Sequence, residues 1–214
     1  MRVYNRFLKR FLDIVLSMIA LLFLLPAFLL ITICIKLDSK GPVLFKQKRV
    51  GKDREEFYII KFRTMKADAP HNMPTALLTN PEQHITKLGK FLRKSSLDEL
   101  PQLVNIIKGD MSIVGPRPVI KDEKALIIKR EHNGVYKVKP GLTGLAQVNG
   151  RDTISIKEKV AFDSEYVSNL SFSLDVKILV KTILNVLQSN GVREGAQINS
   201  ENSIEPKQRV FRQS

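Results

Sequence analysis

Residues 14–35 read IVLSMIALLFLLPAFLLITICI and contain no charged side chain. A helix crosses the hydrocarbon core of a bilayer with roughly 20 apolar residues, so this stretch is long enough to do so. A cleaved signal peptide has a shorter apolar run and a small-residue cleavage site, which this segment lacks. The stretch therefore predicts a helix that enters a membrane.

The flanks and the middle of this stretch favour re-entry over a straight crossing. Basic residues lie on both sides: Arg2, Arg6, Lys9 and Arg10 before it, and Lys36, Lys40, Lys46, Lys48 and Arg49 after it. Lysine and arginine favour the cytoplasmic side, so both ends are drawn to the same face. Pro26 lies near the middle and removes a helix hydrogen bond, which predicts a membrane kink. A straight span with a mild kink is the open alternative, because membrane helices tolerate proline.

The remaining sequence predicts an α+β fold that is mostly helical. Val43–Val50 and Phe57–Met65 read as two strands, and the intervening Gly51-Lys52-Asp53 predicts a small β-hairpin. Lys61 and Arg63 should share one cationic face of the second strand, opposite a buried face. Expected helices cover Thr86–Lys94, Leu97–Lys108, Lys121–His132, Ile156–Leu170 and Leu174–Leu187.

Three further segments complete this outline. The last expected helix is amphipathic, which fits either a membrane surface or ordinary core packing. Ala67–Gln83 carries three prolines and reads as a mobile loop, whereas Lys139–Gly150 reads as a glycine-rich loop with one short strand. We divide the chain into a re-entrant helix with its flanks (1–40), a cytosolic catalytic domain (41–190) and a polar tail (191–214).

Composition limits the chemistry. Lysine and arginine total 35 against 21 acids, which gives a formal charge of +14. That balance favours an anionic partner, either nucleic acid, anionic lipid or a phosphorylated substrate. The single cysteine, Cys34, excludes an internal disulfide and a cysteine-based metal cluster. The three histidines show no metal-ligand spacing.

The segment Ser95–Pro101, SSLDELP, places two adjacent acids at an expected helix start. Ser96 and Glu99 have the S-x-x-E spacing of a capping box. Alternatively, Pro101 is the first helical residue and Asp98 and Glu99 directly precede it. In both arrangements the acids complement the helix dipole, and on spacing alone this capping role is the stronger interpretation.

A catalytic interpretation of the acids depends on cations elsewhere in the sequence. Arg93 closely precedes the acids, and Lys61, Arg63 and Arg117 could converge on the same place. Arginine binds phosphate through two parallel hydrogen bonds, and lysine binds it as a point charge. Paired acids among such cations also suit Mg²⁺, which prefers carboxylate and phosphate oxygens. Phosphate binding therefore stays open beside helix capping.

Four motifs follow one another along the chain: KFRTM at 61–65, SLDELPQL at 96–103, GDMSIVGPRP at 109–118 and KPGLTGLAQVNGR at 139–151. In sequence and order they resemble the bacterial sugar transferase family, the monotopic polyprenyl-phosphate phosphoglycosyl transferases. The resemblance extends from the basic N-terminus to about Gly191, which is nearly the whole chain. Such long motifs in one order make a specific signal.

The resemblance implies an enzyme that transfers a phospho-sugar from a UDP-sugar to polyprenyl (undecaprenyl) phosphate, releases UMP and initiates membrane glycoconjugate assembly. It implies that Asp98 is the nucleophile, which forms a covalent aspartyl phospho-sugar, and that Asp98 also contacts Mg²⁺. Glu99 is implied as a base or a positioning group. Lys61 and Arg93 resemble residues near the phosphates, and we assign Arg63 to substrate binding with them.

The resemblance also implies a nucleotide site and a location. Pro116-Arg117-Pro118 resembles the loop that shapes the nucleotide site, and Arg151 matches a motif position expected to bind an anion. The family uses a re-entrant helix, which implies a monotopic protein of the bacterial inner membrane with its catalytic domain on the cytoplasmic face. Family members often carry Ser-Pro at the break, whereas Leu25 precedes Pro26 here, which leaves the depth of re-entry open.

Two rival interpretations differ in kind. A membrane-tethered nucleic-acid-binding protein would explain the positive charge, but the cations are dispersed and no helix-turn-helix, zinc or aromatic RNA motif occurs. We therefore expect UDP-sugar, polyprenyl phosphate and the phospholipid membrane as partners, and no nucleic acid. A non-catalytic scaffold of the same fold would release no UMP from any UDP-sugar. The sequence leaves the transferred sugar open.

Overall fold

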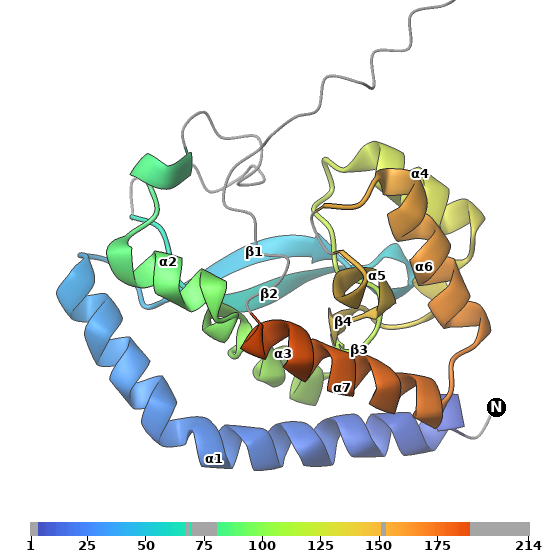
Figure 1. Cartoon of the computed structure of the whole chain (residues 1–214), viewed down its shortest axis with the longest axis horizontal. Coiled ribbons are helices and arrows are strands. Elements are labelled where there is room, and N and C mark those ends of the chain that lie inside the picture. The colour runs from blue at the N-terminus through green and yellow to red at the C-terminus, as the bar shows by residue number, and fades with distance from the viewer. Residues whose placement is uncertain (1–3, 67–68, 70–80, 151–152, 189–214) are drawn as a thin grey trace, which may run out of the picture.

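The computed structural model describes residues 4–66, 69, 81–150 and 153–188, and this part of the chain is mostly helical with two small sheets (Figure 1). Its helices and strands are α1 (Lys9–Asp38), β1 (Leu44–Val50), β2 (Glu56–Phe62), α2 (Lys87–Lys94), α3 (Gln102–Lys108), β3 (Ser112–Val114), α4 (Lys124–His132), β4 (Gly141–Thr143), α5 (Leu145–Val148), α6 (Ile156–Ser168) and α7 (Phe172–Leu187). The predicted α+β, mostly helical class is confirmed.

The long N-terminal helix α1 contains the predicted apolar stretch. Pro26 lies inside this helix, and the helix continues on both sides of it. Figure 1 shows that α1 runs along one side of the molecule and then changes direction toward the β1–β2 end. By length and composition α1 could cross a membrane.

One side of α1 packs against the rest of the chain at both of its ends. Near its start, Arg10 donates hydrogen bonds to two carbonyls at the C-terminal end of α3. One turn later, the buried carboxylate of Asp13 accepts a 3.0 Å bond from the backbone N–H of Ile113. Beyond the other end, Arg63 donates a 2.7 Å bond to the carbonyl of Ser39. Both ends of α1 therefore contact the same folded body.

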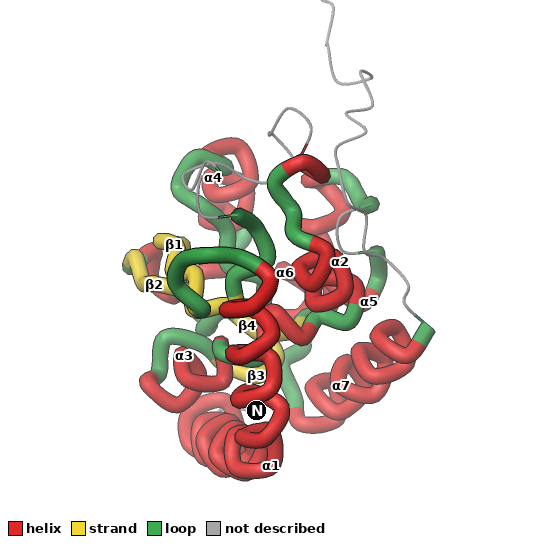
Figure 2. Tube along the Cα trace, turned by 90° about the vertical axis from the view of Figure 1, so that its left-hand side faces the viewer, coloured by secondary structure: helices red, strands yellow, loops and turns green. Residues whose placement is uncertain are grey.

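The opposite side of α1 is exposed and apolar. Exposed side chains of α1 include Phe11, Leu16, Met18, Ile19, Leu22, Phe23, Leu25, Leu29, Leu30, Ile33 and Leu37. A second exposed apolar row lies on α7 and comprises Phe172, Val176, Val180, Ile183, Leu184 and Leu187. The two helices lie on the same side of the molecule in two perpendicular views (Figures 1 and 2). They create one largely apolar side of the protein.

The predicted hairpin is confirmed. β1 and β2 pair in antiparallel register, with Phe45 opposite Lys61 and Arg49 opposite Phe57. The expected division of β2 into a buried and a cationic face is wrong, because both faces are covered. Ile59 on the face of Lys61 is buried, and so are Phe62 on the other face and the side chain of Arg63.

The motif around residues 109–118 forms a second, smaller sheet with a later motif. β3 and β4 pair in parallel, with Ser112 opposite Gly141. A Cβ atom built on Gly141 would lie 2.1 Å from the backbone nitrogen of Gly115, so only glycine permits this close approach. β4 is the short strand expected within 139–150, whereas β3 was not predicted. This sheet places the Gly115–Pro118 loop at its end.

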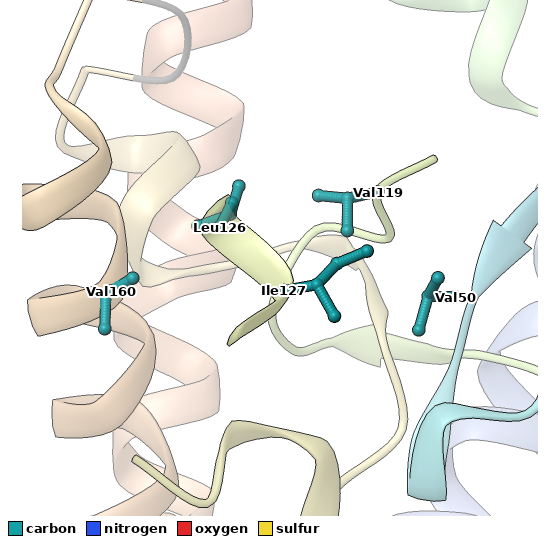
Figure 3. Close-up of a cluster of buried hydrophobic side chains, with 5 residues drawn as sticks. All are labelled: Val50, Val119, Leu126, Ile127 and Val160. Carbon is teal, nitrogen blue, oxygen red and sulfur yellow. The ribbon is translucent and has the colours of Figure 1, made fainter. Parts of the chain in front are cut away.

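Helix α4 connects this loop to the C-terminal half of the chain. Val50, Val119, Leu126, Ile127 and Val160 form a buried cluster. Figure 3 shows α4, which carries Leu126 and Ile127, between Val160 of α6 on one side and Val119 with Val50 on the other. Burying such aliphatic side chains stabilises the fold by about 1.5–3 kcal/mol each. The cluster fixes the chain directly after Pro118 to two helices.

The predicted helices are present with altered ends. The expected helix over Leu97–Lys108 is divided into a 3-10 turn at Leu97–Glu99 and the helix α3, which ends at Gly109 with a positive φ of 103°. The charged helix α4 begins at Lys124, three residues later than predicted, and 139–150 contains the short helix α5. The tail from Gly191 and residues 67–68 and 70–80 of the predicted mobile loop lie outside the described residues.

Candidate active site

The two adjacent acids lie in the 3-10 turn Leu97–Glu99, between α2 and α3. Ser96 enters the turn in the left-handed region with a φ of 57°, which redirects the chain after α2. Asp98 and Glu99 are 8% and 6% exposed. Buried carboxylates need charged or hydrogen-bonded partners, because an unpaired charge is costly to remove from water. Their partners therefore define the site.

Neither acid occupies the N-cap position of α3. The N-cap position of α3 is Pro101, and the Ser96 side chain makes no capping hydrogen bond. The capping box suggested by the S-x-x-E spacing is therefore wrong. The alternative start at Pro101 is correct to within one residue.

Glu99 joins two cations that come from distant parts of the chain. Its Oε1 accepts a 2.8 Å bond from Nζ of Lys61 on β2 and a 2.8 Å bond from Nη2 of Arg117. Its Oε2 lies 3.4 Å from Nη1 of Arg117, so the carboxylate faces both arms of the guanidinium. Charge-assisted pairs of this kind are stronger than neutral hydrogen bonds. The structure thus brings two of the predicted substrate-binding residues to the acids.

Asp98 shares one of these cations. Its Oδ2 lies 3.9 Å from Nζ of Lys61, which places this ammonium group between the two carboxylates. Burial lowers the pKa of Lys61, and Arg117 lowers it further, whereas Glu99 and Asp98 oppose the shift. The site therefore contains a lysine that loses its charge at a lower pH than an ordinary lysine.

Two other predicted substrate-binding residues, Arg93 and Arg63, contact other parts of the chain. Arg93, near the end of α2, donates a 2.8 Å bond from Nε to the hydroxyl of Thr64. Arg63 bonds to backbone carbonyls that follow α1, including a 2.6 Å bond to that of Lys40. Its guanidinium is thus directed to the C-terminal end of α1. Arg151 lies outside the described residues.

The Gly115–Pro118 loop that carries Arg117 is fixed by hydrogen bonds on both sides. The backbone N–H of Gly141 donates a 2.9 Å bond to the carbonyl of Pro116. The backbone N–H of Val50 donates a 2.9 Å bond to the carbonyl of Val119. Pro116 and Pro118 also restrict their own φ angles. The loop is therefore a rigid support for Arg117.

The prediction missed Arg49, which belongs to the surroundings of the site. In the hairpin register, Arg49 and Lys61 lie on the same face. Burial lowers the pKa of Arg49 to about 10, and the neighbouring charge of Arg117 contributes to this shift. The Nε of Arg49 is buried without a hydrogen-bond partner. The Gly51-Lys52-Asp53 turn is the signal that could have indicated this placement, because a turn at these residues sets the strand register and so the face on which Arg49 lies.

Two further residues behind the site were also missed. Arg130 on α4 donates a 2.8 Å bond to the carbonyl of Arg117 and pairs with Asp163 on α6. Arg130 and Asp163 lie 33 residues apart, in two different predicted helices. No local sequence pattern connects them, so the fold had to be known before their contact could be found.

Residues 4–189 match the family model described as bacterial sugar transferase. The chain is 44% identical over 186 residues to a UDP-glucose:undecaprenyl-phosphate glucose-1-phosphate transferase of Escherichia coli, covering 84% of this chain and 40% of that protein. It is 38% identical over 204 residues to an undecaprenyl-phosphate galactose phosphotransferase of Salmonella typhimurium, covering 87% of this chain and 42% of that protein.

A third relative is closer in length. The exopolysaccharide production protein ExoY of Rhizobium meliloti is 40% identical over 199 residues, which cover 86% of this chain and 87% of that protein. The chain thus spans less than half of the length of the Escherichia coli and Salmonella relatives. Because the family model covers most of the chain, the chain belongs to the bacterial sugar transferase family.

Proposed function

We propose that this protein transfers a phospho-sugar from a UDP-sugar to polyprenyl (undecaprenyl) phosphate, releases UMP and thereby initiates membrane glycoconjugate assembly. The observation that carries the proposal is the buried turn in which Asp98 lies beside Glu99, with Lys61 and Arg117 against Glu99. A nucleophilic acid surrounded by phosphate-binding cations suits attack on a diphosphate. The Escherichia coli and Salmonella relatives, which are named as undecaprenyl-phosphate sugar phosphotransferases, support the same substrates.

The first step forms a covalent intermediate on Asp98. A carboxylate oxygen of Asp98 attacks the β-phosphorus of the UDP-sugar and forms an O–P bond. The bond between that phosphorus and the oxygen bridging to the α-phosphate breaks, and UMP leaves with the electron pair. Lys61 and Arg117 stabilise the negative charge on the phosphate oxygens, because they lie at the turn that carries the nucleophile.

The second step transfers the group to the lipid. A phosphate oxygen of polyprenyl phosphate attacks the phosphorus of the aspartyl phospho-sugar. The bond between phosphorus and Asp98 breaks, the carboxylate is regenerated and the product is a polyprenyl diphospho-sugar. A phosphate nucleophile is already anionic near neutral pH, so this step requires no strong base.

Glu99 serves as a positioning group in this mechanism. Oε1 of Glu99 accepts bonds from both Lys61 and Arg117, and Oε2 also faces the Arg117 guanidinium. The same two bonds hold both cations beside Asp98. Of the two roles implied by the family resemblance, the geometry supports positioning over general-base catalysis.

The residues around Asp98 fit a magnesium ion held largely by the substrate. Among the residues that the structure describes, no group of three or more histidine, cysteine or acidic side chains could hold a metal. Mg²⁺ commonly uses one or two carboxylates and completes its coordination with phosphate oxygens and water. Asp98 would supply the carboxylate, and the bound ion would neutralise charge on the diphosphate.

The arrangement of α1 supports a monotopic protein of the bacterial inner membrane. A straight crossing would place the contacts of Arg10 and of Arg63 on opposite sides of a bilayer, yet both contacts belong to one folded body. A helix that bends near Pro26 and returns avoids this conflict. The basic flanks favour the cytoplasmic face for both ends of the helix. The apolar rows of α1 and α7 supply the surface that contacts lipid.

The decisive experiment compares Asp98→Asn with the wild-type protein in nanodiscs, in an assay of UMP release with a panel of UDP-sugars, Mg²⁺ and polyprenyl phosphate. Asp98→Asn should fold, remain membrane-bound and release no UMP, whereas the exposed control Asp122→Asn should match the wild type. Mass spectrometry without polyprenyl phosphate should find a phospho-sugar on Asp98. Normal turnover of Asp98→Asn would refute the nucleophile assignment.

A further inference from the structure

Arg130 and Asp163 form an ion pair that is almost completely enclosed. Nη2 of Arg130 lies 2.6 Å from Oδ2 of Asp163, and Nε lies 2.9 Å from the same oxygen. Their side chains are 3% and 1% exposed. Enclosing two charges costs desolvation energy that the attraction between them barely offsets, so such a pair is weak evidence for a stabilising role.

The two helices hold this pair against the back of the active-site loop. Arg130 follows Leu126 and Ile127 by one turn of α4 and is buried, so it lies on the same inward side of that helix. Asp163 follows Val160 by three residues on α6, so its carboxylate shares the inward face of that helix. The ion pair thus lies beside the aliphatic cluster, between the same two helices.

The remaining arm of the guanidinium reaches the active-site loop. Nη1 of Arg130 donates a 2.8 Å bond to the carbonyl of Arg117. That carbonyl is the only polar group of the peptide that joins Arg117 to Pro118, because proline has no N–H. This peptide has no N–H to donate, so the bond from Arg130 to the carbonyl oxygen can fix the orientation of the peptide plane. The Arg117 side chain leaves this backbone toward Glu99.

We propose that Arg130 and Asp163 act as a positioning pair for Arg117, in which Asp163 orients the Arg130 guanidinium and Arg130 fixes the Arg117 carbonyl. The pair reaches the site through the bond from Arg130 to the Arg117 carbonyl. The proposal rests on the proposed function in so far as Arg117 binds a phosphate of the UDP-sugar. It assigns a role in substrate binding to two residues outside the motifs of the family.

The test is a double-mutant cycle between the pair and Arg117, measured with the full chain in nanodiscs. Arg130→Met with Asp163→Leu removes both charges together, which leaves no unpaired ion in the interior. We expect this replacement to lower kcat/KM for the UDP-sugar roughly tenfold, mostly through a higher KM, because Arg117 is no longer oriented. In the Arg117→Gln background the same replacement should change kcat/KM less than about twofold.

A matched variant separates positioning from general stability. Val160→Ala removes buried volume at the same α4–α6 contact and should lower the melting temperature while leaving KM unchanged. Arg130→Lys keeps the charge beside Asp163 but loses the forked geometry, so it should raise KM in the same direction as the double replacement. Equal losses of kcat/KM in the presence and absence of the Arg117 side chain would overturn the proposal.

Hydrogen exchange makes the proposal testable without turnover. Peptides covering 112–119 should exchange faster in the Arg130→Met, Asp163→Leu protein than in the wild type or in Val160→Ala. Unchanged exchange would overturn the positioning role even if the enzyme is active. The two proposals can also fail separately. If the Arg130→Met, Asp163→Leu protein exchanges faster but the wild-type protein releases no UMP, the positioning pair is retained and only the proposed function is refuted.

Discussion

Nζ of Lys61 and Oε1 of Glu99 lie 2.8 Å apart, although the two residues are separated by 38 positions and belong to β2 and to the turn before α3. This contact connects the KFRTM motif to the two acids. Arg117 approaches the same carboxylate from a third motif. Glu99 is therefore the residue at which three of the sequence motifs meet.

Glu99→Gln should impair both the site and the fold. The amide keeps the shape of the side chain but leaves Lys61 and Arg117 close together without the carboxylate between them. We expect kcat/KM to fall about tenfold to a hundredfold and stability to fall by about 1–3 kcal/mol. UMP release and thermal unfolding measure these effects. Full activity in Glu99→Gln would contradict the positioning role assigned to Glu99.

The lowered pKa of Lys61 predicts the alkaline limb of the pH profile. Burial favours the neutral amine, so Lys61 loses its charge below the ordinary lysine value of 10.5. The KM for UDP-sugar should therefore rise with pH before 10.5 is reached. Lys61→Arg should shift this limb to higher pH, because a guanidinium stays protonated. An identical alkaline limb in both proteins would assign it to another group.

Arg63→Gln tests whether this residue binds substrate or anchors α1. Its guanidinium bonds to the carbonyls of Ser39 and Lys40, so we expect a stability loss of about 1–3 kcal/mol and little change in KM. The exposed Lys48→Gln in the same hairpin is the control. A raised KM with unchanged stability would instead support the substrate-binding role inferred from the motif.

Accessibility labelling tests the re-entrant topology. Cys34 is the only cysteine, so it is first replaced by serine. Single cysteines at Asn5 and Lys40 should then react with a membrane-impermeant reagent from the same side of sealed vesicles. A straight crossing would give reaction from opposite sides, and Pro26→Ala should move the protein toward that result.

The exposed row of α7 predicts contact with lipid. A cysteine at Ile183, which is 61% exposed, should carry an environment-sensitive fluorophore into an apolar medium when vesicles are added. Its emission should shift to shorter wavelength. Lys177 lies off the apolar row and is the matched labelling site. Equal shifts at the two positions would contradict an oriented contact of α7 with the membrane.

The elements that depend on neighbouring residues in the sequence were predictable. The charge-free run indicated α1, and the turn residues at 51–53 indicated the hairpin, because both depend on neighbouring residues. The helices α6 and α7 were expected to within a few residues, and the spacing of apolar side chains on one face supported the expectation for α7. The interruption of the helix after Glu99 was left open, because the sequence fitted a helix from Leu97 and a helix that starts at Pro101.

The assembly of the candidate site was only partly predictable. Convergence of Lys61 and Arg117 on the acids was expected, but the cationic face of β2 was expected to be undivided. Instead, Lys61 turns to the acids and Arg63 to the end of α1. The direction that each of these side chains takes depends on which elements pack against each end of the strand. Local spacing contains no information about that packing.

The contacts of α1 also have a practical consequence for anyone seeking a water-soluble fragment. Ile31 and Ile35 are buried together with Phe62 and Leu92, and Ala20, Leu21 and Leu24 cover the cluster that contains Ile59, Leu103, Ile106 and Met111. Deleting the first 40 residues would uncover side chains that are at most 5% exposed in the intact protein. Helix α1 is thus part of the hydrophobic core, and a chain truncated at this point should aggregate rather than dissolve.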